Sequence, residues 1–173
     1  MGPLGCAATK LLALRDHSAV SIPLVEPDEV WVYRFEAPDT PAPHPRPDLA
    51  GISERLHEHV LKALKRRGID ARSADAFPAP GVPHNLFLVR GVVIAADLGS
   101  GNGFLGLGAP KSRLETLVWI YRDSGEVRQT IQDFETRAER HGLDEDVVRS
   151  AELIAERLHR LYVAQAWRPP PPE

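Results

Sequence analysis

The sequence contains one cysteine, Cys6, which excludes an internal disulfide and a cysteine-based zinc cluster. It has no excess of positive charge. The 21 Lys and Arg are outnumbered by 24 Asp and Glu, and the net charge of −3 argues against a general nucleic-acid binder, which needs a clustered cationic surface. Long apolar runs are also missing. The longest, Val92 to Ala96, is far short of the roughly 20 residues that span a bilayer, so we expect no transmembrane helix.

Proline is the residue in excess, at 16 positions where average usage would give roughly nine. The prolines are clustered, so they separate structured stretches. A chain of 173 residues makes one domain. We expect a leader or anchor segment over residues 1–27, a single α+β domain over residues 28–168 and a proline-rich tail over residues 169–173.

One proline cluster lies between positions 38 and 47, where every proline fixes φ and removes an N–H group. These restrictions exclude a helix or an inner strand and favour a stiff, extended segment. We interpret it as a spacer in preference to a ligand for a proline-binding protein.

Hydrophobic periodicity predicts strands over residues 28–36, 69–73, 85–98, 113–122 and 127–137, and helices over residues 48–68 and 144–167. In the first strand, alternation places Trp31, Tyr33 and Phe35 on one face and Val30 and Val32 on the other. Both faces are apolar, so this strand should be interior to the sheet. The strand over 69–73 could return parallel to the first around the helix between them.

The last two predicted strands are joined by the turn sequence Asp123 to Glu126, which predicts an antiparallel hairpin. The final strand is the more polar and suits a sheet edge that could accept a further strand. The order of elements predicts an α+β two-layer sandwich, with a mixed, mostly antiparallel sheet of about five strands and two main helices on one face.

A glycine-rich run, Gly99 to Gly108, contains a literal G-x-G-x-x-G after a predicted strand. Dinucleotide binding needs a helix immediately after the glycines, because the N–H groups of that helix hold the pyrophosphate. A β pattern follows here instead. The run is therefore either a contact surface for a partner or a flap over the sheet. As partner-binding residues we predict Gly103, Phe104, Leu105, Gly106, Leu107 and Gly108.

Catalytic and metal-binding patterns do not stand out. His57 and His59 are two positions apart on a predicted helix, so they point away from each other and cannot chelate one ion. No G-x-S-x-G nucleophile motif occurs. We expect no catalytic residues, no metal site and no cofactor.

The residues around Cys6 have a small residue immediately before a cysteine close to the start, as at the cleavage site of bacterial lipoprotein precursors. Lipid attachment at Cys6 would tether the domain to a membrane without inserting it. The apolar stretch of a signal peptide does not precede Cys6, so this interpretation requires that an export signal was removed. A cloning leader with an incidental cysteine is the alternative.

The pattern as a whole resembles the bacterial family known as domain of unknown function 4410. The resemblance covers residues 27–167 and rests on order and hydrophobic shape. The segments that carry it are Pro27 to Phe35, Leu64 to Ile69, Asn85 to Gly91, Gly103 to Gly108, Leu114 to Tyr121, Phe134 to Thr136 and Ala164 to Trp167. It implies an envelope lipoprotein of Gram-negative bacteria, anchored through a cysteine near the mature start.

We therefore expect a non-enzymatic domain on the periplasmic side of the outer membrane, tethered at Cys6, that binds another envelope protein or its own copies and binds no nucleic acid. The alternative is a small-ligand-binding or hydrolytic domain with a pocket under the Gly99 to Gly108 loop.

Overall fold

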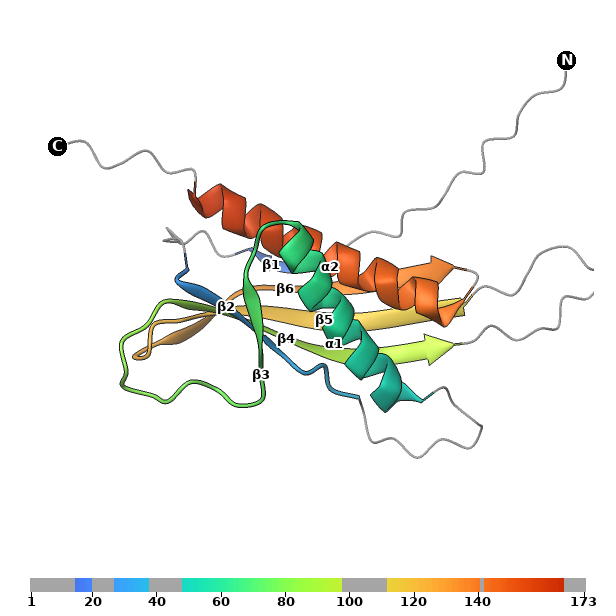
Figure 1. Cartoon of the computed structure of the whole chain (residues 1–173), viewed down its shortest axis with the longest axis horizontal. Helices are drawn as coiled ribbons and strands as arrows, with labels where there is room; N and C mark the ends of the chain where they lie inside the picture. Colours follow the sequence, from blue (N-terminus) through green and yellow to red (C-terminus); the bar gives the residue numbers. More distant parts are fainter. Residues whose placement is uncertain (1–14, 20–26, 38–47, 98–111, 141, 167–173) are drawn as a thin grey trace, which may run out of the picture.

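The computed structural model describes residues 15–19, 27–37, 48–97, 112–140 and 142–166. These residues form six strands and two helices (Figure 1). In chain order the elements are β1 (Arg15–Ala19), β2 (Glu29–Tyr33), α1 (Leu49–Arg66), β3 (Ala71–Ala74), β4 (Leu86–Asp97), β5 (Ser112–Asp123), β6 (Arg128–Arg140) and α2 (Leu143–Ala166).

The strands make one mixed sheet in the order β1-β6-β5-β4-β2-β3. β1, β6, β5 and β4 pair antiparallel in succession, while β2 pairs parallel with both β4 and β3. The predicted α+β class, the mostly antiparallel sheet, the interior position of β2 and the parallel return of β3 are confirmed. The sixth strand is β1.

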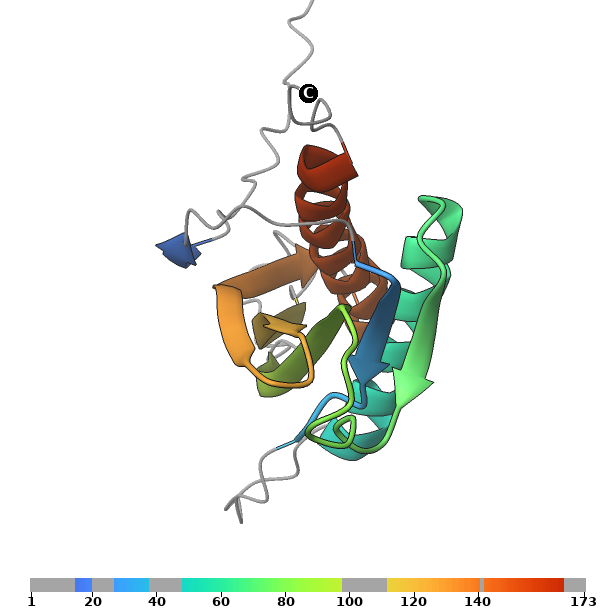
Figure 2. The same cartoon turned by 90° about the vertical axis from the view of Figure 1, so that its left-hand side faces the viewer.

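Both helices pack on the same face of the sheet, as predicted (Figure 2). The main core lies between them and that face, and it includes Leu56 of α1, Phe87 of β4, Phe134 of β6 and Ile154 of α2. Burying these side chains removes apolar surface from water, which stabilises the fold by roughly 25 cal/mol for each Å² buried. Among the described residues, neither helix has the length of apolar sequence that crossing a bilayer requires.

Helix α1 begins and ends where its local sequence predicts. The Asp48 carboxylate accepts a hydrogen bond from the Gly51 N–H at 3.0 Å, and Gly68 leaves the helix with φ of 76°. Near the end of α1, Arg66 and Arg67 both pair with Glu152 of α2. Burial would raise the pKa of Glu152, but the hydrogen bonds from these two arginines outweigh it and hold the pKa below its usual range.

One edge of the sheet differs from the prediction, which was wrong there. Residues 15–19, which it assigned to an extended leader, form β1 and pair with residues 132–135 of β6. β6 is therefore not an edge strand along that stretch, and its backbone there cannot accept a further strand. Five residues next to a proline-interrupted segment carry too little periodicity to reveal a strand whose partner lies more than 110 residues away.

Phe35 was also placed on the wrong face. It lies in the main core on the helix side, while Trp31 and Tyr33 lie on the opposite face. Val32 pairs with Val89 and Glu36 with Val92, so four steps along this segment correspond to three along β4. The extra residue shifts the alternation by one position and turns Phe35 toward the helices.

Candidate functional site

The sheet face that no helix covers carries every tryptophan and tyrosine of the described strands. Trp31, Tyr33 and Tyr121 pack in a small second cluster on this face. Trp119 shares the face with Tyr121, because side chains alternate along β5, and it stands opposite Arg90 of β4. The phenylalanines of the strands lie instead in the main core. Tyr and Trp rings have an apolar body and a polar atom, which suits a surface that meets both water and a partner.

One end of this uncovered face is closed by the loop of residues 75–85, which joins β3 to β4. The Phe77 ring lies 4.7 Å from the Tyr33 ring, and the Arg128 guanidinium lies 4.0 Å from the centre of the Phe77 ring. The Tyr33 hydroxyl donates to the Ala76 carbonyl at 3.3 Å. These contacts fix the start of the loop over the sheet.

The end of the loop is held by a buried carboxylate at the β5–β6 turn. Asp123 accepts hydrogen bonds from His84 Nε2 at 2.7 Å, from the Gly125 N–H at 2.8 Å and from Arg128 Nε at 2.7 Å. The Gly81 N–H also donates to the Gly125 carbonyl at 3.0 Å. We call Asp123, His84, Gly125 and Arg128 the Asp123 clamp.

Burial opposes the charge on Asp123, whose side chain is only 5% exposed, and would raise its pKa. The hydrogen bonds from Gly125, Arg128 and His84 outweigh burial, so the pKa of Asp123 lies below its usual range. Asp123 is therefore a stable anion near neutral pH.

The pairing of His84 with Asp123 resembles half of a catalytic triad. The neighbouring hydroxyl, Ser124 Oγ, donates to the Val127 carbonyl at 3.2 Å. The carboxylate is shared with Arg128 and a backbone N–H, whereas a triad carboxylate serves mainly to orient its histidine. These contacts engage the clamp in fixing the end of the loop.

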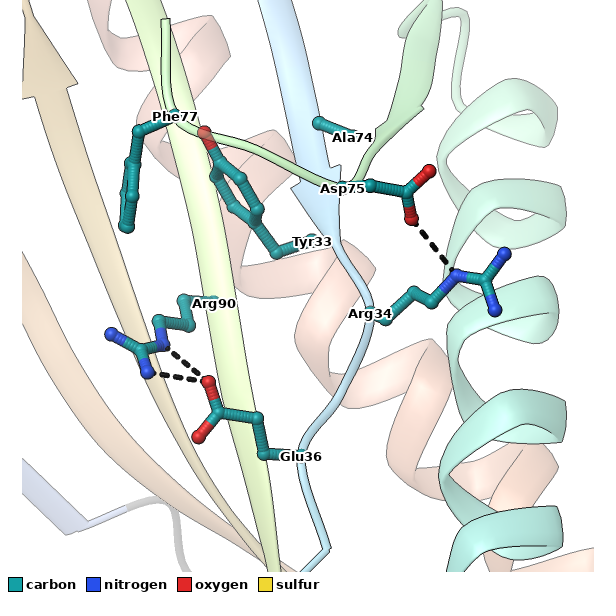
Figure 3. Close-up of a pocket in the computed structure, with 7 residues that line it drawn as sticks. All are labelled: Tyr33, Arg34, Glu36, Ala74, Asp75, Phe77 and Arg90. Carbon is teal, nitrogen blue, oxygen red and sulfur yellow. Dashed lines mark hydrogen bonds and ion pairs between the residues drawn. The ribbon is translucent and has the colours of Figure 1, made fainter.

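Two hollows open beside the loop. The first, about 280 Å³, is lined in part by Tyr33, Phe77 and Arg90. Figure 3 shows an ion pair on either side of Tyr33 in this hollow: Arg90 with Glu36, and Arg34 with Asp75. Each arginine already has a carboxylate partner, so the hollow offers no uncompensated charge to a ligand.

The second hollow has a volume of about 420 Å³, and we call it the Trp31 groove. Trp31 and Leu86 lie on the sheet side of it, prolines and Val82 come from the loop, and Asp28 and Glu29 supply carboxylates. Its volume is within the range of small-ligand and short-peptide sites.

His57 has a structural position between α1 and the sheet. Its Nδ1 lies 3.0 Å from the Tyr33 carbonyl, so Nδ1 carries the hydrogen, and Nε2 lies 2.9 Å from Ser73 Oγ, from which it accepts. Burial lowers the pKa of His57, partly offset by the bond to the carbonyl. With both ring nitrogens engaged, His57 has none left for a metal ion.

The predicted site residues are not among those that the structure describes. Cys6 and the run from Gly103 to Gly108 lie outside the described residues, as does any pocket beneath that run. β5 follows it from Ser112, in agreement with the predicted β pattern. Within the ranges that the structure describes, no three His, Cys, Asp or Glu side chains gather as a metal site requires.

Neither the clamp nor the groove was predicted from the sequence. The clustered prolines were interpreted as separating structured stretches and residues 123–126 as a turn, and both descriptions are correct locally. His84 and Asp123 are 39 positions apart. The one available signal was a histidine directly after the proline cluster, and it does not name its partner.

No family model matches the chain, and no curated protein matches it by sequence. Solved structures match its fold. PelC from Paraburkholderia phytofirmans, solved as a dodecamer, is 12% identical over 85% of this chain and 96% of that chain, with a TM-score of 0.55. A variant of the same dodecamer is 15% identical over 90% and 98%, with a TM-score of 0.54.

A third match is protein XCC0632 from Xanthomonas campestris, which belongs to domain of unknown function 330. It is 12% identical over 84% of this chain and 89% of that chain, with a TM-score of 0.50. At these identities the likeness concerns the fold alone.

Proposed function

We propose that this chain is a non-enzymatic cell-envelope domain that binds protein partners, its own copies included, through the uncovered face of its sheet. The observation that carries the proposal is the segregation of side chains described above: the strand tryptophans and tyrosines on the uncovered face, the strand phenylalanines under the helices. Tyr and Trp are enriched in protein interfaces because they bury large areas with few rotatable bonds.

Self-association is one form that such binding would take. PelC, which has the same fold, was solved as a dodecamer. The glycine-rich residues Gly103 to Gly108 join the strands β4 and β5, and we include them in the proposed contact surface. The resemblance to domain of unknown function 4410 supports an envelope location on the periplasmic side of the outer membrane.

The uncovered face is testable with a photo-crosslinking residue at position 119 in the full-length protein in cells. We expect protein adducts from this position and few from position 148 on α2, where Val148 is 41% exposed but lies in the helix layer. In a reconstituted complex, Trp119→Ala should weaken the contact at least tenfold, because truncating a central interface tryptophan costs about 2 kcal/mol or more. Adducts at position 148 alone would contradict the proposal.

The lipid anchor is tested separately. Mass spectrometry of the natively expressed protein should find lipid on Cys6, and Cys6→Ser should move the protein from the membrane fraction to the soluble fraction. The matched control, Ala7→Ser, should remain in the membrane fraction. Unmodified Cys6 in protein recovered from the cytosol would rule out the anchor.

A further inference from the structure

The Trp31 groove has an apolar wall and a tryptophan that is already fixed in place. The Arg72 guanidinium stacks 3.9 Å from the centre of the Trp31 ring, and Trp31 Nε1 donates to Glu29 at 2.6 Å. Val82 is 57% exposed on the loop side. Grooves that combine an aromatic ring with an apolar wall are the usual docking sites of polyproline II segments, whose carbonyl groups are free to accept hydrogen bonds.

The charges of the groove favour a cationic ligand. Glu29 and Arg72 neutralise each other at 3.0 Å. Asp28 is exposed, lines the same groove and makes no ion pair with a described residue. The groove therefore presents one uncompensated carboxylate beside its apolar part.

A segment of this chain has the matching chemistry. Residues 38–47 contain five prolines, which favour the extended polyproline II conformation, and two charged residues, Asp39 and Arg46, near opposite ends. Arg46 lies between Pro45 and Pro47, seven positions from Asp39. A segment that is extended before binding loses little conformational entropy when it docks. The guanidinium of Arg46 can pair with the carboxylate of Asp28.

Arg46 cannot reach Asp28 of its own chain. Glu29 pairs with Leu86 and Glu36 with Val92, six positions along β4, which places Glu29, the neighbour of Asp28, about 20 Å from Glu36. Helix α1 begins toward the Glu36 end of β2 (Figure 1). Arg46 is two residues from the Asp48 cap of that helix, and two residues span at most about 7 Å, so Arg46 stays at the end of β2 opposite Asp28.

We infer that the Trp31 groove binds the proline-rich segment 38–47 of a second copy of this chain. Asp28 of the groove precedes β2 and the segment follows β2 in the chain, so the contact is head to tail and each copy can use both at once. Such an interface builds a ring where the rotation closes and a filament where it does not. The inference rests on the self-association that is part of the proposed function, and it adds which two surfaces meet.

The groove is tested with a labelled peptide of residues 38–47 with blocked termini and the full chain, by fluorescence anisotropy. We expect saturable binding that weakens at least fivefold with Val82→Asp and is unchanged with Val127→Asp. Val127 is 63% exposed on the nearby hairpin and does not line the groove. Equal weakening by both variants, no binding, or binding only of a peptide of the proline-rich tail, residues 165–173, would overturn the inference.

A charge exchange tests the contact in the intact protein by sedimentation. Asp28→Arg and Arg46→Asp should each lower the weight-average mass at a given concentration, and an equimolar mixture of the two variants should recover it, since the changed groove then faces a changed segment. If neither substitution changes the weight-average mass, the inference is overturned and the proposed function stands. If position 119 gives no protein crosslinks while the peptide still binds the groove, the proposed function is overturned and the groove contact stands.

Discussion

Asp123→Ala is expected to lower the free energy of unfolding by about 3–5 kcal/mol, because removing one partner of a buried charge network leaves the others uncompensated. Asp123 is the shared acceptor of His84, Arg128 and the Gly125 N–H, and its side chain is 5% exposed. Urea denaturation measures the loss. Hydrogen exchange should also show earlier opening of residues 75–85 than of the α1 core, since the clamp holds that loop.

The matched control is Asp75→Ala in the same loop. Asp75 pairs with Arg34 at 3.0 Å, but both side chains are more than 70% exposed. Exposed ion pairs contribute about 0–1 kcal/mol, so this change should be nearly neutral. A similar cost for both substitutions would show that the Asp123 clamp does not stabilise the domain.

Lowering the pH should reproduce part of the loss of stability that Asp123→Ala causes. The pKa of Asp123 in the folded protein lies below its ordinary value of 3.8. A carboxyl of this kind stabilises the fold at pH values above its unfolded pKa, and the contribution is lost as pH falls from there toward the folded pKa. Below about pH 4 the wild-type stability should therefore fall more steeply than that of Asp123→Ala.

Gly91→Ala is expected to destabilise the domain by about 1–3 kcal/mol, the usual cost of adding atoms to a filled core. Gly91 lies in β4 on the helix side, and a Cβ built there would overlap the Cε1 and Cδ1 atoms of the Phe35 ring. Phe35 is buried in the main core and has no open space to move into. Chemical denaturation should show a lower midpoint with an unchanged slope.

A double-mutant cycle tests the cause. Phe35→Leu removes the ring atoms that meet the new methyl group, so Gly91→Ala should cost less in the Phe35→Leu background than in wild type. Additive costs would mean that the Phe35 ring is not what excludes a side chain at position 91.

The elements whose signals lie within a few residues were predictable. Asp48 and Gly68 mark the two ends of α1, and Gly125, with φ of 84°, makes the turn between β5 and β6. β1 and the inward position of Phe35 were not predictable. Each depends on pairing with a distant strand: β1 with β6, and the segment around Phe35 with β4.

The sequence by itself determined the class of the fold, because hydrophobic period and turn chemistry are properties of neighbouring residues. It also determined which side chains are apolar enough to form a core. Only the tertiary structure decided that His84 meets Asp123, that Phe35 covers Gly91, and that Trp31, Val82 and Asp28 line one groove. Those contacts depend on strand register, and a shift of a single residue reverses the face on which every following side chain lies.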